Sequence, residues 1–144
     1  MASHLSLLKA AVVSKLQEAP AVCSVVEEEA LGNWSTSVAQ AVVVRDNGSE
    51  VSQTSYGLAG VASWTSTLVV DCYVRATSNA NRLTALDALL SAVYTRLMAD
   101  PTLGGTLRGL IPRQVTPADS VQLGDQTSSR ALVFSGLHSA GNTL

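Results

Sequence analysis

Residues 64–100 constrain the fold most, because they join one long strand pattern to one long helix pattern. From 64 to 76, apolar residues hold all the even positions except Ser66, and mostly polar residues hold the odd ones. Side chains alternate between the two faces of a strand. The pattern therefore predicts an antiparallel strand with one covered face, and it leaves Asp71, Tyr73 and Arg75 on the open face.

The helix pattern follows after a short polar turn, with apolar residues at three- and four-residue steps. Thr77, Ser78 or Asn79 can cap its start, since each side chain can accept a hydrogen bond from a free N–H of the first turn. Pro101 ends the helix, because the residue before a proline is pushed away from helical geometry. We expect the apolar stripe to pack on the even face of the strand; it consists of Leu83, Leu86, Leu89, Leu90, Val93 and Leu97.

Similar periodicities assign the rest of the chain. Asp46-Asn47-Gly48 predicts a tight hairpin, since Asn and Gly tolerate the positive φ of such turns, and 46–60 is then a hairpin arm. Pro112 cannot donate to a strand ladder and places its strand at an edge or a bulge. The predicted segments are a helix at 3–19, strands at 21–29, 38–45, 49–56, 106–117 and 130–138, loops at 31–37 and 118–129, and a flexible tail at 139–144.

Together these segments predict an α+β fold with the order α-β-β-β-β-α-β-β. We expect a mostly antiparallel mixed sheet with two helices packed on one face. The length of 144 residues fits one domain, 1–144, which can hold a core without metals or disulfides.

Composition narrows the function classes. The formal net charge of -2 gives no electrostatic footprint for nucleic acid or for an anionic membrane, and no apolar stretch reaches the length of a membrane span. Charged residues make up 14% of the chain, against roughly a quarter in ordinary soluble domains. A surface poor in Lys and Glu is typical of protein interfaces, although a monomer with a Ser/Thr-rich surface has the same composition.

Sequence motifs for catalysis, cofactors and metals are missing from the chain. It has no P-loop, GxGxxG, GxSxG, HExxH or CxxC pattern. A Ser-His-Asp set can be assembled from His138, Asp119 and a serine, but with so many serines this is chance. Cys23 and Cys72 fall in predicted strands and fit buried thiols. We therefore expect no enzyme, no cofactor and no metal site.

The residues that remain as interface candidates lie outside the expected core. Trp34 sits in a predicted loop, where an exposed aromatic suits a protein contact and tucking back onto the sheet is the alternative. Acidic residues gather at 27–29 and arginines in the second half of the chain, an asymmetry that can steer head-to-tail contacts between identical subunits. The candidate interface residues are Trp34, Arg45, Asp46, Asn47, Asp71, Tyr73 and Arg75.

The order of certain segments resembles the tail terminator (tail completion, minor tail) proteins of long-tailed bacteriophages. The similarity runs over residues 5–138. It rests on the following segments in this order: LLKAAVVSKLQ, AVVVR before a polar hairpin, the W-x-x-x-L-x-V strand of Trp64, Leu68 and Val70, RLMADPTLGG, and RALVFSG.

The resemblance implies a structural protein of the virion, at the head-proximal end of the tail, assembled in the host cytoplasm. Proteins of this family form a six-subunit ring that caps the tail tube, stops its polymerisation and offers a surface to the head connector. The implied partners are further copies of the chain, the tail tube protein and a head-tail connector protein. A closed ring needs a heterologous contact, which the charge asymmetry suits. The alternatives are another head-closure or neck subunit and, from a different class, a small ligand-binding domain or enzyme.

Overall fold

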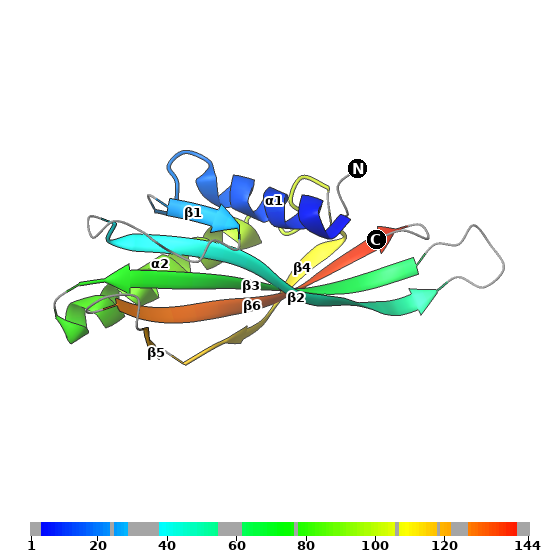
Figure 1. Ribbon diagram of the computed structural model, residues 1–144. Helices are drawn as coiled ribbons and strands as arrows, with labels where there is room; N and C mark the ends of the chain where they lie inside the picture. Colours follow the sequence, from blue (N-terminus) through cyan, green and yellow to red (C-terminus); the bar gives the residue numbers. More distant parts are fainter. Residues whose placement is uncertain are drawn as a thin grey trace.

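The computed structural model describes residues 4–23, 25–28, 38–54, 62–76, 78–105, 107–117, 119–121 and 127–140. It confirms the α+β fold, with a helix, a group of strands, a second helix and a second group of strands (Figure 1). The elements are α1 (His4–Gln17), β1 (Val25–Glu28), β2 (Gln40–Thr54), β3 (Ala62–Arg75), α2 (Asn79–Met98), β4 (Gly109–Val115), β5 (Asp119–Val121) and β6 (Thr127–Ala140).

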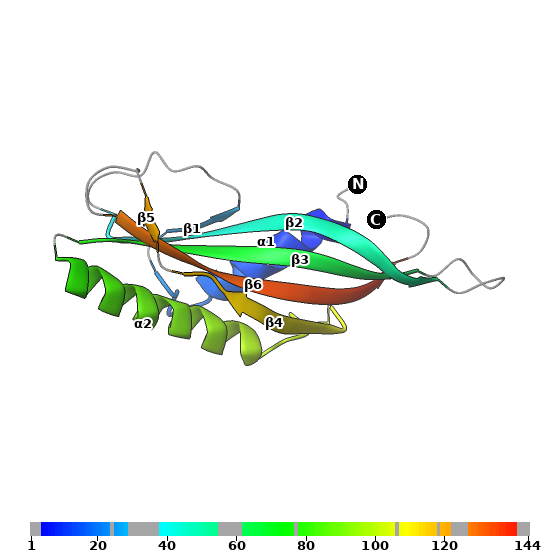
Figure 2. The same cartoon turned by 90° about the horizontal axis from the view of Figure 1, so that it is seen from below.

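The strands form one mixed sheet in the order β1-β2-β3-β6-β4, with β5 also paired to β6. Only the β1–β2 pair is parallel among the pairs of the described strands. Figures 1 and 2 show β2, β3 and β6 running the length of the molecule, with β2 and β3 reaching beyond the helices at one end. The long strand predicted from residue 64 is β3, and it is the middle strand of the sheet.

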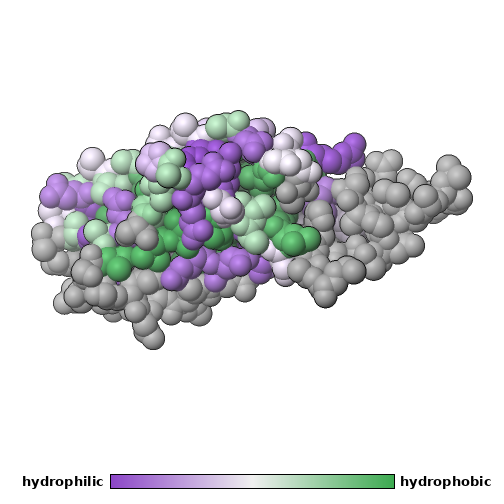
Figure 3. Space-filling model, turned by 90° about the horizontal axis from the view of Figure 1, so that it is seen from above, coloured by the Kyte–Doolittle hydropathy of each residue, from purple (hydrophilic) through white to green (hydrophobic). Residues whose placement is uncertain are grey.

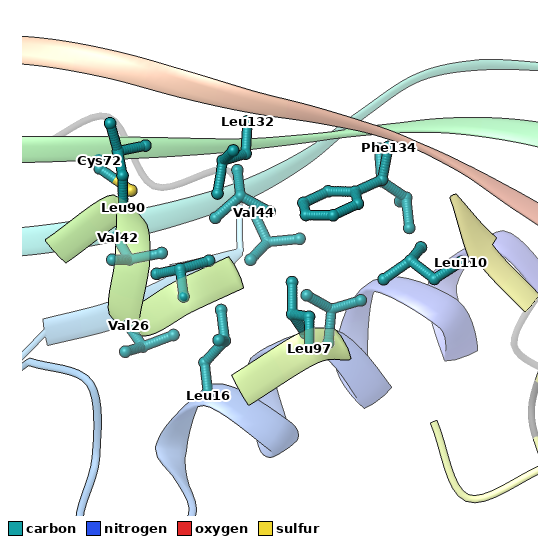
Figure 4. Close-up of a cluster of buried hydrophobic side chains, with 14 of the residues drawn as sticks. Leu16, Val26, Val42, Val44, Cys72, Leu90, Leu97, Leu110, Leu132 and Phe134 are labelled. Carbon is teal, nitrogen blue, oxygen red and sulfur yellow. The ribbon is translucent and has the colours of Figure 1, made fainter. Parts of the chain in front are cut away.

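Both helices cover the even face of β3, as the sequence predicts. Leu68, Val70, Cys72 and Val74 are buried there, and they belong to one cluster with the inner faces of α1 and α2 and with Phe134 of β6 (Figure 4). Burying this many aliphatic side chains supplies most of the driving force for folding, at roughly 25 cal/mol for each Å² of apolar surface removed from water.

One residue of the predicted apolar stripe, Leu83 near the start of α2, is not buried. Ser78 is the cap, and its Oγ accepts from the backbone N–H of Asn81 at 3.4 Å. The stripe from Leu86 to Leu97 is buried, but Leu83 is 40% exposed. Leu83 lies near the beginning of α2, and Figure 2 shows this end of the helix at the end of the sheet.

The hairpin turn predicted at Asp46-Asn47-Gly48 is wrong. β2 runs through these residues without reversing, and its pairing with β3 shifts register between Asp46 and Ser49. Gly48 has a φ of +94° and donates its N–H to Oδ1 of Asp46 at 3.3 Å. The positive φ that a tight turn requires is used here in a β-bulge. Residues 49–54, predicted as the return strand, therefore continue β2, and the tip of the arm at 55–60 lies outside the described residues.

The second half of the chain follows the prediction in its main strands and departs from it at their ends. β4 is an edge strand with a register shift between Pro112 and Gln114, as the proline predicts. The loop predicted at 118–129 contains β5 and the first residues of β6. Ser139 and Ala140, placed in the predicted tail, pair with Ser63 and Ala62. Residues 141–144 lie outside the described part of the chain.

An arginine on α2 holds the end of α1 in place. Arg96 donates to the backbone carbonyls of Lys15, Glu18 and Pro20. The last carbonyls of a helix have no partner within the helix, so these bonds satisfy groups that would otherwise need water. The guanidinium thus connects α2 to the end of α1.

Two leucines on α2 form a matched test of the core. Leu90 is 7% exposed and Leu83 is 40% exposed. Leu90→Ala should lower the free energy of unfolding by about 2–5 kcal/mol, because it removes a buried side chain and leaves a cavity. Leu83→Ala should change it by about 0.5 kcal/mol. Urea denaturation of both variants measures the difference, and equal losses would show that the buried face of α2 is assigned wrongly.

Candidate functional site

The structure brings together three of the sequence-predicted residues on the odd face of the sheet. Arg45 on β2 and Asp71 on β3 form an ion pair, with 2.7 Å between Nε and Oδ2. They are diagonal neighbours, because Asp71 pairs with Val43 and Arg45 pairs with Val69. Tyr73 is two residues beyond Asp71 on the same face. The side chain of Arg45 is 47% exposed and that of Asp71 only 15%.

This group can bind but has no reactive member. The hydrogen bond that Arg45 donates to the Asp71 carboxylate raises the pKa of Arg45, so the guanidinium keeps its charge. Burial, with the nearby Asp71 carboxylate as a further cause, raises the pKa of Tyr73, so the phenol stays neutral at physiological pH. A fixed cation, a carboxylate that accepts its hydrogen bond and a neutral phenol suit polar recognition of another surface. They do not make a nucleophile with a base.

The odd face is less open than the alternation suggests. Val43, Val69 and Ala131 are buried on it although no described helix covers them. Asp71, Tyr73 and Arg75 are half-buried, and Arg75 extends the polar group along β3.

The remaining predicted residues lie elsewhere. Asp46 faces α1, where its Oδ2 is 3.1 Å from Nζ of Lys9. This pair ties α1 to β2 on the even face, so Asp46 does not join Arg45 in the odd-face group. Asn47 is exposed in the bulge. Trp34 lies outside the described residues.

A buried hydroxyl–imidazole chain is a polar feature that sequence reasoning missed. Ser66 Oγ lies 2.7 Å from Oγ of Ser49 and 2.8 Å from Nε2 of His138. Ser66 is 0% exposed and His138 is 1% exposed, so no substrate reaches them. Asp119 pairs with Ser129 near the other end of β6, roughly 30 Å along the strand from His138. The Ser-His-Asp set is therefore not assembled. The hydrogen bonds among Ser49, Ser66 and His138 instead satisfy buried polar groups.

Thiols and acidic side chains do not converge on a metal site in the described part of the chain. No group of three or more His, Cys, Asp or Glu residues is close enough there to hold an ion. Cys72 is fully buried and Cys23 half-buried, and burial raises the pKa of both thiols. None of the described helices is long and apolar enough to cross a membrane.

The main hollow among the described residues is open to solvent. It lies between α2 and residues 20–22, lined mainly by small side chains such as Ala88, Ala92 and Ala99, with Arg96 at its side. Arg96 is already engaged with the carbonyls at the end of α1. On the face shown in Figure 3, hydrophilic and hydrophobic residues are interspersed. Such a surface suits contacts with macromolecules more than the enclosure of a small ligand.

Comparison with known proteins adds one finding. No protein-family model and no curated protein matches the sequence. The chain shares its fold with a chain from the virion of a native gene transfer agent particle. That match has a TM-score of 0.53 and 16% identity, and covers 92% of this chain and 95% of the other. At this identity the likeness concerns the fold, and it extends over nearly the whole of both chains.

The buried hydroxyl–imidazole chain can be tested by removing its central group. Ser66→Ala deletes the hydroxyl that bonds both Ser49 and His138, and should lower the free energy of unfolding by about 1–3 kcal/mol. Ser49→Ala removes only one of the two bonds and should cost less, about 1 kcal/mol. Thermal and urea denaturation compare the variants. A Ser66→Ala variant as stable as the wild type would show that the bonds do not form.

The Arg45–Asp71 pair should contribute little to stability, because Arg45 is 47% exposed. A double-mutant cycle with Arg45→Ala and Asp71→Ala should give a coupling of about 0.2–1 kcal/mol. High salt should reduce it, since exposed charges are screened. A coupling that is several-fold larger and independent of salt would mean that the pair is buried and structural, which would remove it from the candidate surface.

Proposed function

We propose that this chain is a structural virion protein that acts as a tail terminator, forming a ring, six-membered in the resembled family, on the end of the tail tube. The observation that carries the proposal is the fold shared with a chain from a gene transfer agent virion over 92% of this sequence. The order of sequence segments, which resembles tail terminators, supports it independently.

The charge distribution on α2 supports an assembly role. The charged side chains of α2 bond within the molecule: Arg82 to Ser128 and Ala76, Asp87 to Arg130, and Arg96 to the end of α1. The outward surface of the helix therefore consists mostly of small or uncharged residues, with Leu83 and Tyr94 exposed at 40% and 43%. The cores of protein interfaces typically contain few charged residues and are enriched in aromatic residues, as is this surface with its exposed Tyr94.

In this proposal the chain works by shape and polar complementarity and catalyses no reaction. Ring closure on the tube would block the surface on which the next tube subunit adds. The opposite side of the ring would then present a surface to the head connector. The partners are thus further copies of the chain, the tube protein and the connector protein, and the site of action is the head-proximal end of the tail.

The proposal is tested by growing tail tubes from purified tube protein with and without this chain. We expect tubes capped at one end by a ring in electron micrographs, and lengths that stop increasing once the chain is added. Native mass spectrometry of the detached caps should give a single oligomer size. Tubes that bind no chain and keep growing would overturn the terminator role. Binding to the connector protein with no binding to tubes would instead make the chain a neck subunit.

A further inference from the structure

The two edges of the sheet carry opposite charges at matching heights. β1 and the outer part of β2 form one edge, and β4 and the short β5, which both pair with β6, form the other. Exposed acids lie on the first edge at Glu28 and Glu50, and exposed arginines lie on or beside the second at Arg108 and Arg113. Glu28 and Glu50 each lie on a cross-strand row of the sheet, and each arginine lies within two residues of the β4 end of one of these rows.

The first row connects Glu28 to the end of β4. Its pairs are Glu28–Val44, Val44–Val70, Val70–Leu132 and Leu132–Val115. Val115 is 48% exposed at the far end of the row. Arg113 lies two residues before it, in the β4 bulge, and donates from Nε to Ser135 at 2.9 Å. That bond uses one of the five N–H donors of the guanidinium and holds the side chain in place.

The second row connects Glu50 to the start of β4. Its pairs are Glu50–Thr65, Thr65–Leu137 and Leu137–Gly109. Arg108 precedes Gly109 and donates its backbone N–H to the carbonyl of Leu137 at 2.7 Å. The two rows cross β6 at Leu132 and Leu137, so they lie about 17 Å apart at both edges.

We propose that the Glu28–Glu50 edge of one copy docks on the Arg108–Arg113 edge of a second copy. The inference rests on the proposed function for its biological setting, but the charge pattern carries it. When two copies lie side by side in the same orientation, the edge that carries the two acids meets the edge that carries the two arginines. A two-fold contact that joins like edges would set acid against acid or arginine against arginine. The pattern therefore selects a heterologous contact, which closes into a ring or continues as a filament.

The other charged side chains near the first edge either form ion pairs within the same molecule or are acidic like Glu28 and Glu50. Arg45 is paired with Asp71, and Asp46 with Lys9, within the same molecule. Glu27 adds a further acid beside Glu28. The edges are also poorly suited to direct strand pairing between copies, because β1 has four residues and β4 contains Pro112 and a bulge. Side chains rather than a continued sheet therefore make the contact, with Val115 as its exposed apolar member.

Charge reversal at each edge tests the contact. The variants E28K/E50K and R108E/R113E change only exposed residues, so both should keep the circular dichroism spectrum of the wild type. At low salt we expect wild-type chains to self-associate by analytical ultracentrifugation and native mass spectrometry. Each reversed variant alone should associate at least about tenfold more weakly, because both rows then become repulsive. E18K, which reverses an exposed acid that follows α1 and belongs to neither edge strand, is the control and should behave as wild type.

Mixing gives the decisive measurement. An equimolar mixture of E28K/E50K and R108E/R113E should recover assembly, because alternating copies restore opposite charges at every contact. The variant with all four changes should also self-associate. Wild-type chains that stay monomeric up to millimolar concentration, reversed variants that assemble as wild type, or a mixture that does not recover would each overturn the inference. Rings that assemble as described but never cap tubes would leave the contact standing and contradict only the terminator role.

Discussion

The pairing of β3 on both of its edges is the constraint on which the other elements depend. β3 joins β2 on one side and β6 on the other along nearly all of its length. Its even residues supply the surface on which both helices pack, and its odd residues supply the polar face. Since side chains alternate strictly along a strand, a slip of one residue would exchange the two faces and destroy the core. The register of β3 thus decides both stability and the surface available for binding.

The helices depend on polar contacts as well as on the core. Arg96 bonds to carbonyls at the end of α1, and Lys9 in the first half of α1 pairs with Asp46 on β2. These contacts use charges that would otherwise lie on the surface. Among the exposed charges that remain, those on the sheet edges can specify a neighbour and its orientation.

Alternation in residues 64–76 and the spacing of leucines in α2 were sufficient to predict the central strand, the helix and the shared core. Local sequence patterns gave a wrong prediction where pairing with a strand distant in the sequence determines the structure. Asp46-Asn47-Gly48 has the residues of a tight turn, yet β3 is long enough to continue the pairing, and the same positive φ is used in a bulge. The Ser66–His138 bond and the row that joins Glu28 to β4 have no local signature, because both follow from the register of strands far apart in the sequence. Asp71 and Tyr73 were predictable as odd-face residues, but not the pairing of Asp71 with Arg45.

The position of β6 has a consequence for how the protein reaches its structure. β3 pairs with β6, which lies beyond α2, β4 and β5 in the sequence. Contacts between such distant segments are slow to form, because a long loop must close before any pairing is gained. Until then the β2–β3 pair has an open strand edge and an uncovered aliphatic face, which is the state most prone to aggregate. During synthesis on the ribosome, this interval is the period in which we expect the chain to depend on chaperones.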